Sequence, residues 1–213
     1  MTTYARAVLL IGVPAAFSVL LWFHPMLSDY DDLAGVATRF QVVHVAMVLT
    51  LCLVAVGMYV LLEGLRGRAA SVARVALVPF VAFYVPYVAF EGVALGVLGQ
   101  ELGALSAAQG DVAGTRLVEE FATNPILGEP GVFWALGSTA WIVAVVATVV
   151  AFRRAGAPVA LQVLLGASAL IATHAPPLAP VGLLCFAAAG WLVLRARHAA
   201  APEPASPSVA AAA

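Results

Sequence analysis

The sequence has no lysine, few charged residues and only two cysteines, and each shortage excludes a class of protein. Arginine supplies all ten Lys/Arg positions and the net charge is -1, so there is no broad basic surface for nucleic acid to bind. Cys52 and Cys185 lie inside apolar stretches, where a thiol packs as a small hydrophobic group and forms no disulfide framework. Charged residues make up 10% and hydrophobic residues 63%, which predicts an integral membrane protein with the lipid bilayer as its first partner.

Short catalytic motifs are also missing from the sequence. It contains no phosphate-binding glycine loop and no HExxH, GxSxG or CxxC pattern, so nucleotide-driven transport by this chain is not expected. The sequence therefore leaves open whether the protein is an enzyme, and function has to be argued from the polar residues of the apolar segments.

Six apolar segments predict an all-α, polytopic membrane protein, with a bundle of six transmembrane helices over residues 1–198 arranged as three hairpins. A helix rises 1.5 Å per residue, so about 20 residues cross the hydrocarbon core. The last two segments are short, which leaves a re-entrant pair as the alternative to two full spans. The expected spans are 7–23, 41–65, 75–98, 132–152, 158–174 and 180–194.

Other parts of the chain are expected to depart from simple spans. Pro79 and Pro86 lie in the third span and predict a kink or a locally opened helix. The outer connection, 99–131, is too polar to span the membrane, and 106–121 has the spacing of a short surface helix that could act as a lid. The tail, 199–213, has too little bulky apolar surface to pack and is expected to be a disordered cytoplasmic segment.

The distribution of arginine predicts the orientation. With the N-terminus inside, eight arginines lie on the cytoplasmic side, and only Arg39 and Arg116 lie outside. An excess of arginine in short loops marks the cytoplasmic face. The sequence thus predicts a multi-pass protein of the plasma membrane with both termini in the cytoplasm.

Glu91, in the interior of the third predicted span, is the strongest candidate for a functional residue. An ionisable group within a membrane helix is costly and indicates a functional site with a nearby partner. His24 ends the first span, His44 lies three residues inside the second, and His174 ends the fifth, all toward the outer face. We expect Glu91, His44 and His174 to line an outward-facing polar pocket, with His24 at its rim.

Further polar and aromatic residues are expected to line this pocket. Tyr84, Tyr87 and Glu91 are spaced at i, i+3 and i+7, so they share one helix face. The fourth span contributes Trp134, Ser138 and Trp141 in the same outer half. Gly92 and Gly96 form a GxxxG pattern, which predicts close packing of helices within the chain.

Four interpretations of this pocket remain open. Imidazoles and a carboxylate suit zinc or another divalent metal, held by His44, His174, Glu91 and His24, in a site that acts on a lipid or small amphiphile. Two histidines from facing helices could instead ligate a haem. Glu91 could be the proton-accepting residue of a small proton-coupled carrier. A non-catalytic membrane component, with Glu91 hydrogen-bonded between helices, is the fourth.

The residue types at the outer ends are similar to those of the intramembrane zinc hydrolases of the ceramidase and adiponectin-receptor type. Those enzymes have seven helices, a larger set of His, Asp and Ser residues, and a different order along the chain. The resemblance is therefore one of residue types only and implies no membership of that family. The residues that carry it are His24, His44, Glu91, Ser138 and His174.

Overall fold

The computed structural model describes residues 1–25, 33–104, 107–173 and 175–199, and this part of the chain is helical without β-strands. The first segment comprises α1 (Thr3–Ala7), the π-helical η1 (Val8–Gly12) and α2 (Val13–Leu21), and the second is α3 (Leu33–Leu61). The third runs through α4 (Arg68–Pro79), π-helical η3 (Phe80–Tyr84), α5 (Val85–Val88), π-helical η4 (Ala89–Ala94) and α6 (Leu95–Ala104). The rest comprises α7 (Ala107–Ala122), α8 (Val132–Arg154), α9 (Val159–Ala167), the 3-10 helix η5 (Ser168–Thr173) and α10 (Leu178–Ala199).

The predicted all-α class is confirmed, and the helices are apolar enough to cross a membrane. Within the described ranges, five helices have the length and composition of membrane spans: Thr3–Leu21, Leu33–Leu61, Arg68–Leu102, Val132–Arg154 and Leu178–Ala199. The apolar helix Val159–Thr173 is shorter. It coincides with the fifth predicted span, whereas the sixth predicted span lies within Leu178–Ala199, a helix that is longer than predicted and long enough to cross the membrane.

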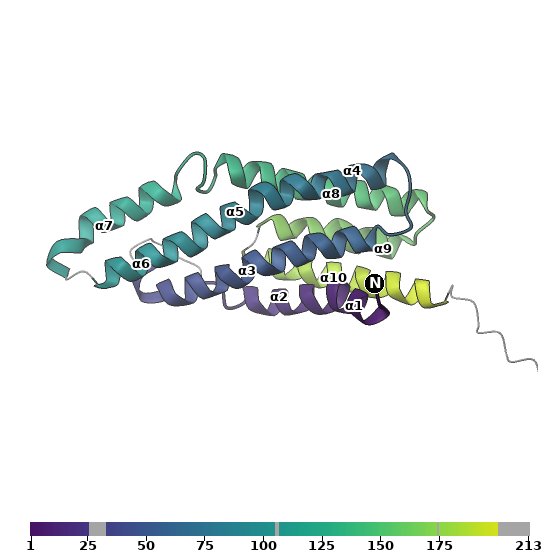
Figure 1. Ribbon diagram of the computed structural model, residues 1–213, viewed down its shortest axis with the longest axis horizontal. Coiled ribbons are helices and arrows are strands. Elements are labelled where there is room, and N and C mark those ends of the chain that lie inside the picture. Colours follow the sequence, from purple (N-terminus) through teal and green to yellow (C-terminus); the bar gives the residue numbers. More distant parts are fainter. Residues whose placement is uncertain (26–32, 105–106, 174, 200–213) are drawn as a thin grey trace, which may run out of the picture.

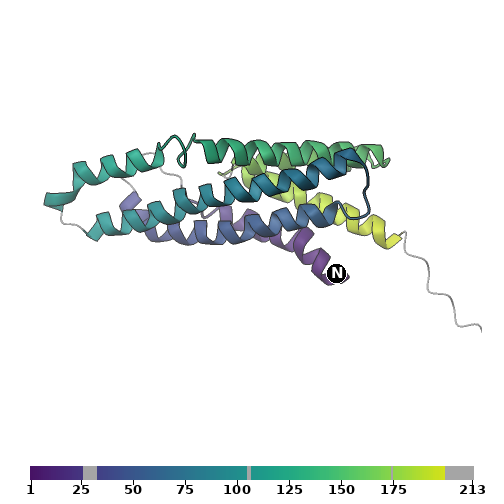
Figure 2. The same ribbon diagram turned by 45° about the horizontal axis from the view of Figure 1, so that its top comes forward.

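The helices pack side by side along one common direction (Figures 1 and 2). α8 lies against α4 and η3, α10 lies against α2, α9 and η5, and α3 lies against η4 and α6. In both views α6 and α7 project beyond the ends of the other helices. α7, which occupies the stretch with the spacing of a short surface helix, packs Val118 and Ala122 against Leu33, Phe40 and Leu95.

The π-helical turns before two prolines show how the bundle accommodates those residues. A proline has no N–H and its ring clashes with the carbonyl four residues earlier. For Pro14 that earlier residue is Leu10, inside η1, and for Pro86 it is Ala82, inside η3. A wider turn at this position relieves the clash, so the predicted local opening of the third helix is confirmed.

Close helix contacts in the core depend on glycine at two positions. A β-carbon built on Gly137 of α8 would lie 2.7 Å from the backbone nitrogen of Tyr84, and one on Gly190 of α10 would lie 2.5 Å from the carbonyl oxygen of Leu10. Both neighbours are backbone atoms that cannot rotate away. The large side chains between these contacts, among them Phe17, Trp141 and Phe186, are almost completely buried.

We expect Gly137→Ala to lower the free energy of unfolding by about 1–3 kcal/mol, the usual cost of overpacking a filled core. The added methyl group would push α8 away from η3. The matched control is Gly166→Ala in α9, where a built β-carbon meets nothing within 4 Å. That variant should unfold at the same temperature as the wild type or slightly above. Equal losses in both variants, measured by thermal unfolding in detergent, would contradict the packing argument.

Candidate functional site

The structure brings together two of the three predicted histidines, one just after α2 and the other within α3. His44 of α3 is buried, with 1% of its surface exposed. Its Nε2 lies 3.3 Å from Nε2 of His24, which follows α2, and its Nδ1 lies 2.8 Å from the carbonyl oxygen of Phe40. His174, the third predicted imidazole, lies outside the described residues.

The contact with Phe40 determines which nitrogen of neutral His44 carries hydrogen. A carbonyl oxygen only accepts hydrogen bonds, so Nδ1 is the donor and the lone pair of Nε2 faces His24. Burial lowers the pKa of His24 below its usual value, while a hydrogen bond to the backbone of Pro25 acts in the opposite direction. A lowered pKa favours the neutral imidazole, the form that can donate a lone pair.

The ring of His44 packs directly on the turn that carries Glu91. A β-carbon built on Gly92 would collide with the imidazole of His44, and one built on Gly96 would lie 2.6 Å from Cβ of Gln41. Gly92 and Gly96 thus let α3 approach η4 and α6, and the predicted packing of the GxxxG pattern within the chain is confirmed.

The carboxyl group of Glu91 lies with a phenol and a second carboxyl group. The hydroxyl of Tyr87 donates a 2.6 Å hydrogen bond to Oε2 of Glu129 and also interacts with Glu91. Oε2 of Glu91 is buried and has no hydrogen-bond partner among the described residues. A phenol has a single hydrogen, so it cannot donate fully to both carboxylates at once.

Glu129 is a member of this cluster that the sequence did not point to. It lies in the polar connection before α8, three residues ahead of Val132. No signal in the sequence placed it there, because Tyr87 lies well inside the third predicted span while Glu129 lies before the start of the fourth.

Three of the residues expected to line the pocket donate hydrogen bonds to backbone carbonyls of η5. Tyr84 donates a 2.7 Å hydrogen bond to the carbonyl oxygen of Ala172, and Ser138 donates to the same oxygen at 3.4 Å. The indole of Trp141 donates to the carbonyl oxygen of Ser168 at 3.0 Å. Trp134 is partly buried, and its indole nitrogen has no partner among the described residues.

The π-helical turn that carries Glu91 differs from the other two such turns. The positions of η1 and η3 are explained by a proline two residues beyond each turn, but the corresponding position after η4 is Gly96. Wide turns of this kind occur often at functional sites. The local geometry therefore singles out Glu91 independently of its charge.

The predicted four-residue metal site is not assembled in the described part of the chain. There, no group of three His, Cys, Asp or Glu side chains lies close enough to hold one metal ion. Two of the four expected ligands, His24 and His44, are adjacent, while Glu91 belongs to the cluster with Tyr87 and Glu129.

Comparisons with protein families, curated proteins and solved structures find no match for this chain. The function is therefore inferred from the geometry of its own residues.

Replacing Tyr87 with Phe should cost about 1.5–3 kcal/mol of stability, the range for a hydrogen bond to a charged group. In a double-mutant cycle, Tyr87→Phe and Glu129→Ala should cost less together than the sum of the single losses. Tyr59→Phe is the control, because the hydroxyl of Tyr59 makes no hydrogen bond within the described residues. Additive losses in the cycle, from thermal or denaturant unfolding, would show that the Tyr87–Glu129 bond does not form.

Proposed function

We propose that this protein is a six-span plasma-membrane protein with both termini in the cytoplasm, and that it works as a small proton-coupled carrier whose proton site is Glu91. The arginine distribution supports the orientation. A total of six crossings is supported by the short segment Val159–Thr173, because the six residues of η5 adopt the longer 3-10 rise of about 2.0 Å per residue. α9 and η5 together reach about 25 Å, close to the thickness of the hydrocarbon core.

The unpartnered Oε2 of Glu91 carries this proposal. The hydrogen of Tyr87 is already given to Glu129 at 2.6 Å, so this buried oxygen is left without a donor among the described residues. A carboxylate left uncompensated in an apolar setting is costly, and binding a proton or a cation removes that cost.

Two further observations support a carrier. The third helix contains two π-helical turns, η3 and η4, and such wide turns occur often at functional sites. In addition, Glu129 is exposed while Glu91 is only partly exposed. The phenol of Tyr87 between them gives a short route for a proton from the outer surface to the buried carboxyl. The carried compound would be a small molecule or amphiphile taken from the outer side.

The test is Glu91→Gln in proteoliposomes, with internal pH reported by a trapped dye under an imposed membrane potential. Proton uptake should fall about tenfold or more, because glutamine keeps the shape of the side chain but cannot bind the proton. Infrared spectra should also lose the pH-dependent band of a carboxylic acid. The unfolding temperature should stay close to the wild-type value.

The control is Glu101→Gln, which removes an exposed carboxylate on α6 of the same long helix. Proton uptake in this variant should equal that of the wild type. If Glu91→Gln instead lowers the unfolding temperature and leaves proton uptake intact, Glu91 serves to hold helices together and the carrier proposal is wrong.

A second candidate function, favoured by the histidine pair, is a divalent-metal site that acts on a lipid or small amphiphile. Two nitrogen ligands of one tetrahedral zinc ion, each about 2.0–2.1 Å from the metal, lie about 3.3–3.4 Å apart. The observed Nε2–Nε2 distance is 3.3 Å. His44 also bonds a backbone carbonyl through Nδ1, as metal-ligating histidines usually do. Axial ligands of one haem iron need about 4 Å and a porphyrin between them, so zinc fits this spacing better than haem.

Titration of purified protein with Zn²⁺ against a chromophoric chelator tests this candidate. One zinc ion should bind per chain, and His24→Ala and His44→Ala should each weaken binding by about tenfold or more. His198→Ala is the control, because His198 lies on α10 with its Nδ1 bonded to the carbonyl of Leu194. Failure to bind zinc, or equal loss in all three variants, would eliminate the metal site.

A further inference from the structure

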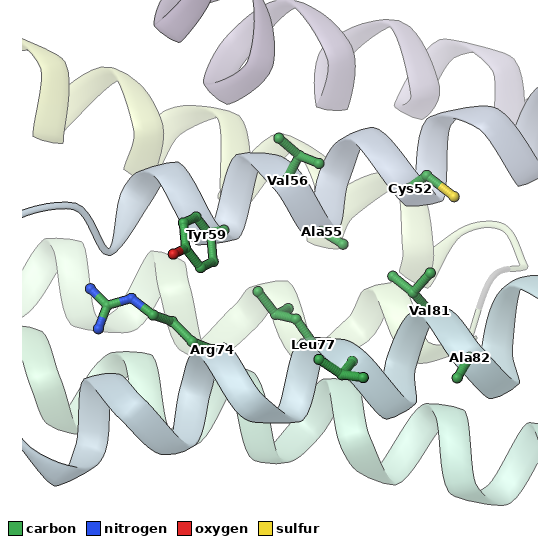
Figure 3. Close-up of a pocket in the computed structure, with 9 residues that line it drawn as sticks. Cys52, Ala55, Val56, Tyr59, Arg74, Leu77, Val81 and Ala82 are labelled. Carbon is green, nitrogen blue, oxygen red and sulfur yellow. The ribbon is translucent and has the colours of Figure 1, made fainter. Parts of the chain in front are cut away.

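Two apolar hollows lie between α3 and the third helical segment. The first, of about 580 Å³, is lined on α3 by Cys52, Ala55, Val56 and Tyr59 (Figure 3). The second, of about 510 Å³, is lined on α3 by Val45, Val48 and Leu49. The facing helix contributes Arg74, Leu77, Val78, Val81 and Ala82 to the first hollow, and Pro86, Ala89, Phe90, Val93 and Ala94 to the second.

The two hollows follow one another along the seam between the two helices, because their lining residues continue the same helical stripe on both sides, and together they are called the groove. On α3 the stripe runs from Val45 to Tyr59, which is about 21 Å of helix. The close contacts between α3 and its neighbour lie at Gly92 and Gly96, so the two helices separate toward Arg74. A groove of this length and apolar lining fits an extended acyl chain.

Arg74 marks one end of this groove, and its guanidinium group is held in position. Its Nη2 donates hydrogen bonds to the carbonyl oxygens of Leu62 at 2.7 Å and Leu65 at 3.0 Å, and the group lies 5.8 Å from the ring centroid of Tyr59. Figure 3 shows Arg74 and Tyr59 at one end of the hollow, with Cys52 at the other. The remaining N–H groups of Arg74 are left to bind an anion.

The surroundings of Arg74 are positively charged. Arg66 and Arg68 are exposed in the same turn, and α4 begins at Arg68, so its N-terminal amides add positive potential. The nearest carboxylate in this turn, Glu63, is already paired with Arg6 at 2.9 Å. A phosphate group is thus favoured here, and a headgroup that also carries a positive amine is disfavoured.

We propose that this groove binds one anionic phospholipid, with an acyl chain along α3 and the phosphate at Arg66, Arg68 and Arg74. The apolar stripe supplies the site for the chain, and the arginine turn selects the charge of the headgroup. The phosphate end of the groove lies on α4, away from Glu91, and its other end is lined by residues of η4, the turn that carries Glu91.

Native mass spectrometry of the full chain, exchanged into equal amounts of phosphatidylglycerol and phosphatidylcholine, tests this proposal. The chain should retain one lipid molecule, and the population bound to phosphatidylglycerol should be at least tenfold larger than the population bound to phosphatidylcholine. Arg74→Gln should reduce that preference severalfold. Arg153→Gln should not, because Arg153 lies in the last turn of α8 and lines neither hollow.

Because Arg74 also bonds two carbonyls, a second pair of variants keeps the test independent of folding. Val78→Trp would fill the groove, whereas Val75→Trp places the same bulk on the same helix outside it, and both valines are 68% exposed. Lipid retention should be lost in the first variant and kept in the second. Equal retention of both lipids, equal behaviour of the two tryptophan variants, or a second copy of the chain seated in the groove would overturn the proposal.

Discussion

Where the helices of this bundle end or deviate from α geometry, side chains from other segments supply hydrogen-bond donors for the backbone. In hydrocarbon a carbonyl without a donor costs several kcal/mol, so this requirement restricts the fold more than hydrophobicity does. Tyr84 and Trp141 bond carbonyls of η5, where the 3-10 geometry replaces the α-helix. Arg74 and Arg197 bond the carbonyls at the end of α3 and in the turn after it. Ser18 bonds the carbonyl of Pro180.

This requirement explains why several polar residues of the apolar segments are structural. A tyrosine or serine in a membrane helix is read from sequence as part of a polar pocket, since its partner cannot be seen. In the structure Tyr84 and Ser138 donate to one carbonyl oxygen, that of Ala172. Glu91 is different, because a carboxylate has no hydrogen to donate to a carbonyl, and its Oε2 stays without a partner among the described residues.

The sequence was informative about depth in the membrane and uninformative about direction around each helix. The proximity of His24 and His44 follows from the equal depth of the two helix ends, and the structure has their Nε2 atoms 3.3 Å apart. The partners of Glu91 could not be derived in this way. The third helix extends to Ala104, well past the predicted end at 98, and Glu129 comes from a connection whose path no periodicity encodes. The π-helical turn η3, which precedes Glu91, and η4, which contains it, also change which face Glu91 occupies relative to an ideal helix.

The imidazole pair and the carboxyl cluster are joined through consecutive residues of one turn. His44 rests on Gly92, and the neighbouring residue, Glu91, carries the buried carboxyl. A change in η4 that moves Glu91 therefore also moves the surface on which His44 packs. The same turn lies at one end of the seam along which α3 and the third segment separate to form the groove. A ligand bound at one end of this seam alters the free energy of binding at the other end only to the extent that it favours a different separation of these two helices. The contacts of Gly92 and Gly96 with α3 fix that separation at their end of the seam, so the end near Arg74 is where the two helices have room to move.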